Sequence, residues 1–156
     1  MNLKDIRISK NLTQEKAAEI LGICRKTYIK YEKNISQIKV NKLKFLCKEL
    51  EDYNKIDEEH GVLTIEQIIE ICKKIFDDYD INFAYLFGSY AKGNATAISD
   101  IDILVDIPID GIIYFELIET LREELHKKVD LLDLNQLKNN FELTKEILKD
   151  GIKIYG

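Results

Sequence analysis

Hydrophobic residues follow two different patterns along the chain, and the pattern changes near residue 64. Up to residue 50 they recur every three or four positions, which is the spacing of one face of an α-helix. This spacing predicts four short helices, over residues 3–9, 14–21, 24–32 and 40–50. Thr13 is a candidate N-cap of the second helix, and Gly22 ends it. The apolar stripe of the fourth helix contains Val40, Leu43, Leu46, Cys47 and Leu50.

From residue 64 onward, helical segments alternate with short apolar runs that are typical of β-strands. Thr64 and Gln67 form a capping-box pattern, which opens a helix that ends near Tyr79. A second helix is expected over residues 113–126, and Asn135 is a candidate cap for a third that reaches Leu148. β-branched and aromatic residues predict strands over residues 83–87, 101–105, 129–134 and 152–154.

The segment between the two patterns is polar, acidic and without periodicity. We therefore expect a linker over residues 53–63, between a first domain of residues 1–52 and a second of residues 64–156. His60 lies within this segment and is expected to be solvated, because a lone histidine makes a poor metal site.

Composition places the chain among ordinary globular proteins, with 46% hydrophobic and 33% charged residues in a length of 156. No apolar run approaches the roughly 20 residues of a membrane span, and no signal-peptide pattern opens the chain, so no membrane contact is expected. Three cysteines, Cys24, Cys47 and Cys72, show no Cys-x-x-Cys spacing. This usage indicates a reduced, cytoplasmic setting.

The two parts of the chain differ in net charge. Residues 1–50 carry 12 Lys and Arg against 5 Asp and Glu, a net charge of +7. The remaining residues carry 11 against 23, a net charge of −12. A basic unit fused to an acidic one suggests that the two bind different partners, although solvated lysines that keep a small domain soluble would explain the basic half equally well.

Candidate chemistry is concentrated between residues 87 and 106. A Gly88-Ser89 turn follows one predicted strand, and Asp100 and Asp102 lie at the start of the next. Glycine lets the backbone pass close to another group, and two residues that are two apart on a strand point to the same side. Paired carboxylates repel each other unless a cation or a proton lies between them, and hard oxygen ligands suit Mg²⁺. This pattern is typical of phosphoryl or nucleotidyl transfer.

Gly88-Ser89, the Asp100-x-Asp102 pair and Ser99 just before it resemble the signature of polymerase-β-type nucleotidyltransferases. Within that superfamily the similarity is greatest to the minimal nucleotidyltransferases (MNT) of prokaryotic HEPN/MNT toxin–antitoxin pairs, and it extends from about Thr64 to the C-terminus. Lys92 stands where the family usually has arginine, so the charge is kept but bidentate phosphate recognition is not. The expected fold is α+β: a small all-α helix-turn-helix domain followed by an α/β domain with a mixed sheet.

The resemblance also implies a substrate, ions and residue roles. ATP is the implied donor of AMP to a hydroxyl group, and two Mg²⁺ ions are the implied cofactors. The implied nucleotide-binding residues are Gly88, Ser89, Lys92 and Ser99. The implied catalytic and metal-binding residues are Asp100, Asp102 and Asp130. Asp133 is the alternative third carboxylate, but we expect it at the far end of its strand, in solvent.

Two short helices that are joined by a glycine-containing turn, with a basic cluster opening the second, are typical of a helix-turn-helix. Residues 12–22 and 31–34 resemble the Xre/Cro repressor-type DNA-binding domain, which would cover residues 1 to about 50. The resemblance implies that Gln14 helps to hold a DNA phosphate. It also implies that the major groove is contacted by Arg25, Lys26, Thr27 and Lys30. Some domains of this type only form dimers, which remains an alternative.

Two functions from different classes fit these features. In the first, the chain is an antitoxin that transfers AMP from ATP to a tyrosine of a cognate HEPN ribonuclease toxin and binds its own promoter DNA. In the second, it is a DNA-binding regulator whose nucleotidyltransferase domain only senses nucleotide or binds the toxin. The three carboxylates and the Gly-Ser turn favour the first. The acidic half disfavours a nucleic-acid acceptor, and the short chain disfavours a drug-modifying enzyme. A homodimer or a hetero-oligomer with the toxin is compatible with either.

Overall fold

The computed structural model describes residues 2–108 and 111–156, which form two compact units. One unit runs to Lys55 and the other begins at Ile56. Among the described residues, no helix is both long enough and apolar enough to cross a bilayer.

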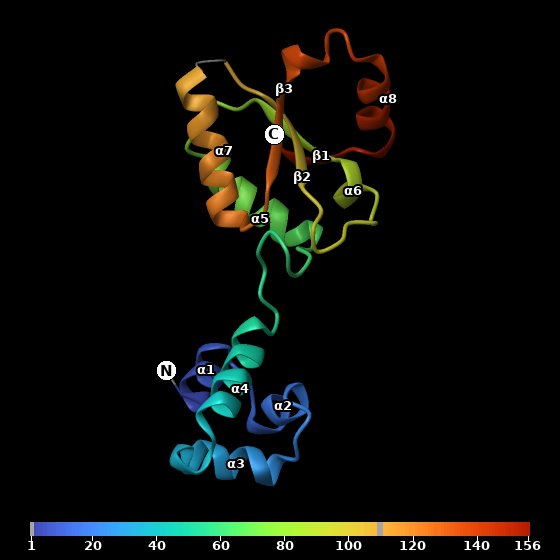
Figure 1. The fold of residues 1–156 in the computed structure, drawn as a ribbon. Coiled ribbons are helices and arrows are strands. Elements are labelled where there is room, and N and C mark those ends of the chain that lie inside the picture. The colour runs from blue at the N-terminus through green and yellow to red at the C-terminus, as the bar shows by residue number, and fades with distance from the viewer. Residues whose placement is uncertain (1, 109–110) are drawn as a thin grey trace. The chain divides into compact units, whose positions relative to one another are not determined.

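The first unit is entirely helical, as its hydrophobic spacing predicted (Figure 1). Its elements are α1 (Leu3–Ser9), α2 (Gln14–Ile20), α3 (Arg25–Lys33), the 3₁₀ turn η1 (Ile35–Gln37) and α4 (Val40–Asp52). The core comprises Leu3, Ile6, Ala17, Ala18, Tyr28, Ile38, Leu46 and Leu50. Thr13 caps α2 by accepting from the backbone N–H of Lys16 at 3.1 Å. Val40, which was expected on the buried stripe of α4, is 68% exposed because it lies at the first position of the helix.

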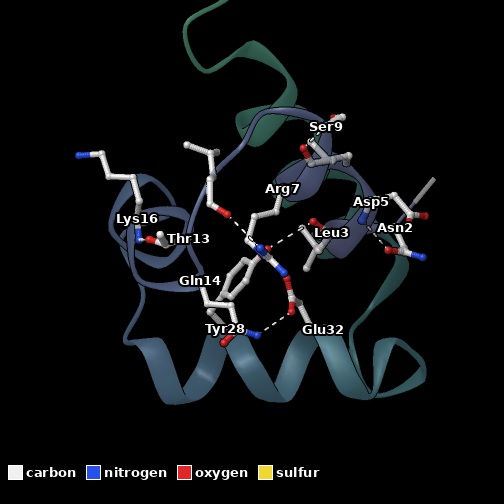
Figure 2. A network of polar contacts seen from close by, with 12 residues as sticks. Asn2, Leu3, Asp5, Arg7, Ser9, Thr13, Gln14, Lys16, Tyr28 and Glu32 are labelled. Carbon is white, nitrogen blue, oxygen red and sulfur yellow. Dashed lines mark hydrogen bonds and ion pairs between the residues drawn. The ribbon is translucent and has the colours of Figure 1, made fainter.

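A partly buried ion pair holds the first unit together (Figure 2). Arg7 of α1 donates through Nε to Glu32 of α3 at 2.6 Å and through Nη1 to the carbonyl of Leu12 at 2.9 Å. Gln14, at the start of α2, donates to the second oxygen of Glu32 at 2.8 Å. The carboxylate of Glu32 therefore joins three helices, and both of its oxygens are satisfied where its side chain is only 5% exposed.

The second unit is an α/β unit built around four strands. Its helices are α5 (Ile65–Phe76), α6 (Gly88–Ala91), α7 (Gly111–Leu125), the 3₁₀ turn η2 (Leu134–Leu137) and α8 (Phe141–Asp150). Its strands are β1 (Phe83–Phe87), β2 (Ile101–Asp106), β3 (Val129–Asp133) and β4 (Ile152–Tyr155). The strand order is β3-β2-β1-β4, with β2 and β3 parallel and the other pairs antiparallel. The expected mixed sheet is confirmed.

Each face of the sheet packs against different helices (Figure 1). On one face, alternate residues of the strands pack with α5 and α7 in the larger core, which includes Ala84, Leu86, Ile101, Ile103, Val105, Val129 and Leu131. On the other face, Phe87 and Leu104 pack with Ile147 of α8 in a small cluster. That second face is only partly covered, and it carries Asp102 of β2 and Asp130 of β3, which alternate with the core-facing residues of their strands.

Two boundaries differ from those that we predicted. The segment 53–63 was expected to be a linker, but Leu63 is buried in the core of the second unit and Ile56 packs against it. Asn135 was expected to cap the last helix, but α8 begins later and is capped by Asn140, which accepts from the N–H of Leu143 at 3.2 Å. The intervening residues form η2 instead, because Asp133 supplies a cap of its own.

Candidate active site

Asp102 and Asp130 lie side by side on neighbouring strands. They are paired in the register of the parallel strands β2 and β3, so their side chains point to the same side of the sheet. Their neighbours Ile101, Ile103 and Val129 are buried in the core on the opposite face. The partly covered face therefore carries both carboxylates, with Asp130 exposed and Asp102 half-buried.

Asp100 completes the acidic group. It precedes β2 directly, it is exposed, and its charge acts on Asp102. Burial and the negative charges of Asp130, Asp100 and Glu146 together raise the pKa of Asp102 to about 6, against an opposite effect of Lys92. A raised pKa of a carboxyl group indicates a place where negative charge is unfavourable and a cation would be favourable.

Gly88 is packed against this group. In the antiparallel register of β1 and β2, Phe87 lies opposite Asp102, so the next residue of the chain turns directly over the carboxylate. Gly88 has a φ of +68°, and a Cβ added to it would lie 2.9 Å from Cγ of Asp102 and closer still to Oδ2. Only glycine fits both the backbone conformation and the space. The group that the Gly-Ser turn approaches closely is therefore the carboxylate of Asp102.

Three further residues were expected to bind nucleotide. Ser89 lies in the single turn of α6, and its carbonyl accepts from the N–H of Asn94 at 3.1 Å. Ser99 does not extend into open space, because its hydroxyl accepts from the N–H of Thr96 at 2.8 Å and so shapes the loop before Asp100. Lys92, at the C-terminal end of α6, is exposed and close enough to Asp102 to affect its pKa.

Lys92 has a partner that the sequence did not indicate. Its Nζ pairs with Oε1 of Glu146 on α8 at 2.6 Å, and both side chains are about one-third exposed. The hydrogen bond to Glu146 raises the pKa of Lys92, with smaller contributions from Asp150 and Asp102. Glu146 was missed because it lies 54 residues from Lys92 and within no recognisable motif. Its placement depends on how α8 packs on the sheet.

The donor set suits a hard cation such as Mg²⁺, since it consists of carboxylates whose mutual repulsion raises the pKa of the central one. Within residues 2–108 and 111–156, no three acidic, histidine or cysteine side chains are already gathered as metal ligands. The three carboxylates would thus have to turn toward a shared ion. The backbone that carries Asp102 and Asp130 is held by the strand pairing, so these two carboxylates would turn by rotation of their side chains.

Asp133 has a structural role, and the expectation that it lies in solvent was wrong. It is only 4% exposed, and its side chain accepts from the N–H of Asn135 at 2.9 Å. Gln136 accepts in return from the N–H of Asp133 at 2.8 Å, which completes a capping box for η2. The spacing of Asp133 and Gln136 in the sequence was the signal that could have predicted this role.

The residues proposed to contact DNA lie on α3 and at the start of α2. Arg25, Lys26 and Lys30 are exposed on α3, so they are available to a partner. Thr27 is engaged within the helix, where its hydroxyl lies 3.0 Å from the Sγ of Cys24. Gln14 is engaged through its amide nitrogen with Glu32, so its part in phosphate binding would have to use the second N–H of the amide (Figure 2).

Comparison with known proteins agrees with both units. Residues 66–156 match the family described as "Polymerase beta, Nucleotidyltransferase", and residues 3–52 match the family "Helix-turn-helix". A "Putative protein adenylyltransferase MJ1379" of Methanocaldococcus jannaschii is 39% identical over 95 residues, which cover 58% of this chain and 94% of that protein.

A second relative and a solved structure are also similar to part of this chain. "Protein adenylyltransferase MntA" of Thermococcus cleftensis is 33% identical over 100 residues, which cover 60% of this chain and 99% of that protein. A crystal structure described as "the toxin-antitoxin with AMP-PNP" has 32% identity and a TM-score of 0.49, with 56% of this chain and 73% of that chain covered.

Proposed function

The chain belongs to the polymerase-β nucleotidyltransferase family, and we propose that it is a protein adenylyltransferase: it transfers AMP from ATP to a hydroxyl group of a partner protein, as the antitoxin of a toxin–antitoxin pair. The observation that carries this proposal is the in-register pairing of Asp102 with Asp130 beneath Gly88. The names of the two relatives, "Putative protein adenylyltransferase MJ1379" and "Protein adenylyltransferase MntA", support a protein as the acceptor.

Each residue of the site has a separate role in the proposed reaction. Gly88 leaves room for the triphosphate to approach the carboxylates, and Lys92 exchanges Glu146 for a phosphate oxygen when nucleotide binds. The acceptor oxygen attacks the α-phosphorus, a new P–O bond forms, and the bond to the bridging oxygen breaks so that pyrophosphate leaves. Asp130, the most exposed acid on a strand of the site, takes the hydroxyl proton.

Asp100, Asp102 and Asp130 are the residues that would hold Mg²⁺. When bound, Mg²⁺ lowers the pKa of the attacking hydroxyl and neutralises charge on the phosphates. Without such a cation, burial and the negative charges of Asp130 and Asp100 raise the pKa of Asp102. Catalysis by this site is therefore mainly a matter of positioning and charge neutralisation.

We propose a tyrosine of a HEPN ribonuclease as the acceptor. The second half of the chain has a net charge of −12, which repels a nucleic acid and attracts a basic protein. A phenol has an ordinary pKa near 10, far below that of an aliphatic alcohol, so less assistance is needed to make it a nucleophile. The resemblance of the Gly-Ser and Asp-x-Asp residues to those of MNT antitoxins supports a HEPN toxin as the partner.

The first unit is proposed to bind the promoter of the same operon. Its family match and the exposed basic residues Arg25, Lys26 and Lys30 support this role. A chain that both modifies the toxin and binds its own promoter would regulate the pair at two levels.

The deciding experiment uses the full chain, ATP labelled at the α-phosphate, Mg²⁺ and the helical protein encoded beside this gene. We expect label on that protein, added AMP on a tyrosine by mass spectrometry, and loss of its ribonuclease activity. The double variant Asp100→Asn, Asp102→Asn should transfer none and still bind promoter DNA. Label only on RNA ends or on a small molecule would refute the antitoxin role.

The alternative function, a DNA-binding regulator that only senses nucleotide or binds the toxin, predicts a different result. ATP would then bind with no label transferred to any partner, and the double variant would silence the toxin as well as the wild type does. The retention of all three carboxylates on one face favours the enzyme.

A further inference from the structure

Lys127 is a buried cation that the proposed reaction does not use. Its side chain is 1% exposed, although a lysine is almost never fully buried unless it is paired. Its Nζ donates to the carbonyl oxygen of Ala97 at 2.5 Å and to that of His60 at 3.1 Å. These two carbonyls come from separate segments, so Lys127 joins parts of the chain that are 30 and 67 residues away from it.

The contact with Ala97 restrains the loop that leads into the site. Ala97 lies three residues before Asp100, and the residue after Asp100, Ile101, donates its N–H to the carbonyl of Lys128 at 2.9 Å. The position of Asp100 is therefore bracketed by two hydrogen bonds, and both come from the dipeptide 127–128. The same dipeptide leads directly into β3, which carries Asp130.

Besides its bond to Lys127, the loop over residues 93–99 contacts the core through Ala95, which is partly buried against it. Its apolar residue Ile98 is 73% exposed, and the hydrogen bond between Thr96 and Ser99 is internal to the loop. Segments that bury little apolar surface open at a low free energy. A hydrogen bond from a charged donor is roughly twice as strong as a neutral one, so Lys127 supplies much of what holds the loop.

The second acceptor of Lys127, the carbonyl of His60, belongs to a turn with several hydrogen bonds of its own. The turn over residues 57–60 is closed by its own hydrogen bonds, since the N–H of Asp57 donates to the carbonyl of His60 at 3.0 Å and the N–H of His60 donates to Oδ1 of Asp57 at 2.8 Å. Lys127 also lies near the negative charge of Asp57. The lysine therefore bridges a hydrogen-bonded turn on one side and the loop on the other.

We propose that Lys127 is a positioning residue of the active site: its ammonium group holds the loop before β2 so that Asp100 faces Asp102 and Asp130. The proposal builds on the proposed function, in which these three acids hold the metal ion. A group that orients a ligand typically changes metal affinity by roughly 10- to 100-fold when it is removed.

The test compares the full-length wild type with Lys127→Met, which keeps the unbranched shape and loses the donors. Mn²⁺ is the probe, and its binding is measured by titration with electron paramagnetic resonance, without nucleotide or partner. We expect Lys127→Met to bind Mn²⁺ roughly 10- to 100-fold more weakly. Hydrogen exchange at the amide of Ser99 should become faster, while exchange in β1 should not change.

Two control variants separate positioning from general damage. Leu125→Ala removes a fully buried side chain of α7, so it destabilises the same unit and leaves the donors of Lys127 in place. Lys128→Met removes the same charge from an exposed neighbour. Both should bind Mn²⁺ as the wild type does. If Lys127→Met does not fold, Lys127→Gln, whose amide nitrogen ends short of the lysine nitrogen, should show the same weakening to a smaller degree.

The possible results distinguish this inference from the proposed function. Unchanged Mn²⁺ binding by both Lys127 variants, or equal weakening by Leu125→Ala, would overturn the positioning role and leave the nucleotidyltransferase proposal in place. A wild type that binds no Mn²⁺ would instead refute the proposed metal-binding role of the three acids, and this inference with it.

Discussion

Gly88 and Asp102 are in such close contact that any side chain at position 88 would displace the carboxylate. A Cβ there would lie 2.9 Å from Cγ of Asp102, and the φ of +68° already disfavours every residue with a side chain. This pair joins the turn that would receive the nucleotide to the carboxylate at the centre of the acidic group. It therefore offers a direct test of the site.

Gly88→Ala should abolish most of the AMP transfer. A displacement of a catalytic group by about 1 Å can lower the rate by about 100-fold, and we expect at least that loss in a labelled-ATP assay. Gly93→Ala is the matched control, because Gly93 has a φ of +71° and nothing within 4 Å of its Cβ position. Both variants should lose about 1–2 kcal/mol of stability from backbone strain, but only the first should lose activity.

Asp102→Asn should stabilise the second unit at pH 8 in metal-free buffer. The folded pKa of Asp102 is raised to about 6 from an ordinary 3.8, so the folded state binds this proton more tightly than the unfolded state does. The stability from this group is complete well below 3.8 and is lost as the pH rises through 6. We expect a gain of about 1–2 kcal/mol at pH 8, which allows for solvent screening of the half-exposed group.

Chemical denaturation at several pH values measures this difference. The variant and the wild type should be equally stable at pH 3, where Asp102 is protonated in both states. Added Mg²⁺ should stabilise the wild type at pH 8 and have little effect on Asp102→Asn. An advantage of the variant that grew toward low pH would contradict the assigned cause.

Substitutions at Asp130 and Asp133 should have opposite effects. Asp130→Asn should abolish transfer and leave stability nearly unchanged, because Asp130 is exposed on the site face. Asp133→Ala should lower the free energy of unfolding by about 1 kcal/mol through loss of the cap of η2, and transfer should survive. Thermal melts and the labelled-ATP assay separate the two roles. Full activity of Asp130→Asn would exclude it as the third carboxylate.

Glu146→Gln should tighten nucleotide binding. It releases Lys92 from its ion pair and removes a negative charge that acts on Asp102, so the KM for ATP should fall roughly two- to fivefold. Lys92→Gln should raise that KM. Glu142→Gln on the same helix removes an equal charge away from Lys92 and serves as the control. A KM that rose in Glu146→Gln would indicate that Glu146 binds part of the substrate complex.

Joint replacement of Arg25, Lys26 and Lys30 by alanine should abolish binding of the full chain to a duplex from its own promoter. In an anisotropy titration, Lys26→Ala alone should reduce the salt slope by about 1 if the lysine contacts a phosphate, and should relax sequence preference if it contacts a base. Lys48→Ala, on the exposed side of α4, removes one charge and is the control for Lys26→Ala. Unchanged affinity of the triple variant for every duplex would refute the assignment of α3 as the recognition helix.

Several features of the site could be predicted from the sequence because they depend on local geometry. Asp100 and Asp102 are two residues apart at the start of one strand, so their shared side follows from the period of a strand. The caps at Thr13 and Thr64 likewise involve partners only three residues away, and both are present. The helical first unit and the mixed sheet of the second follow from periodicity together with the family resemblance.

Other features depended on which distant segments meet, and only the tertiary structure decided them. Asp130 is beside Asp102 because β3 pairs in one particular register with β2, and Asp133 is buried because the chain turns into η2 there. The contacts of Lys92 with Glu146 and of Lys127 with Ala97 bring together residues 54 and 30 positions apart. A sequence pattern records the neighbours of a residue along the chain, whereas burial and pKa depend on its neighbours in space.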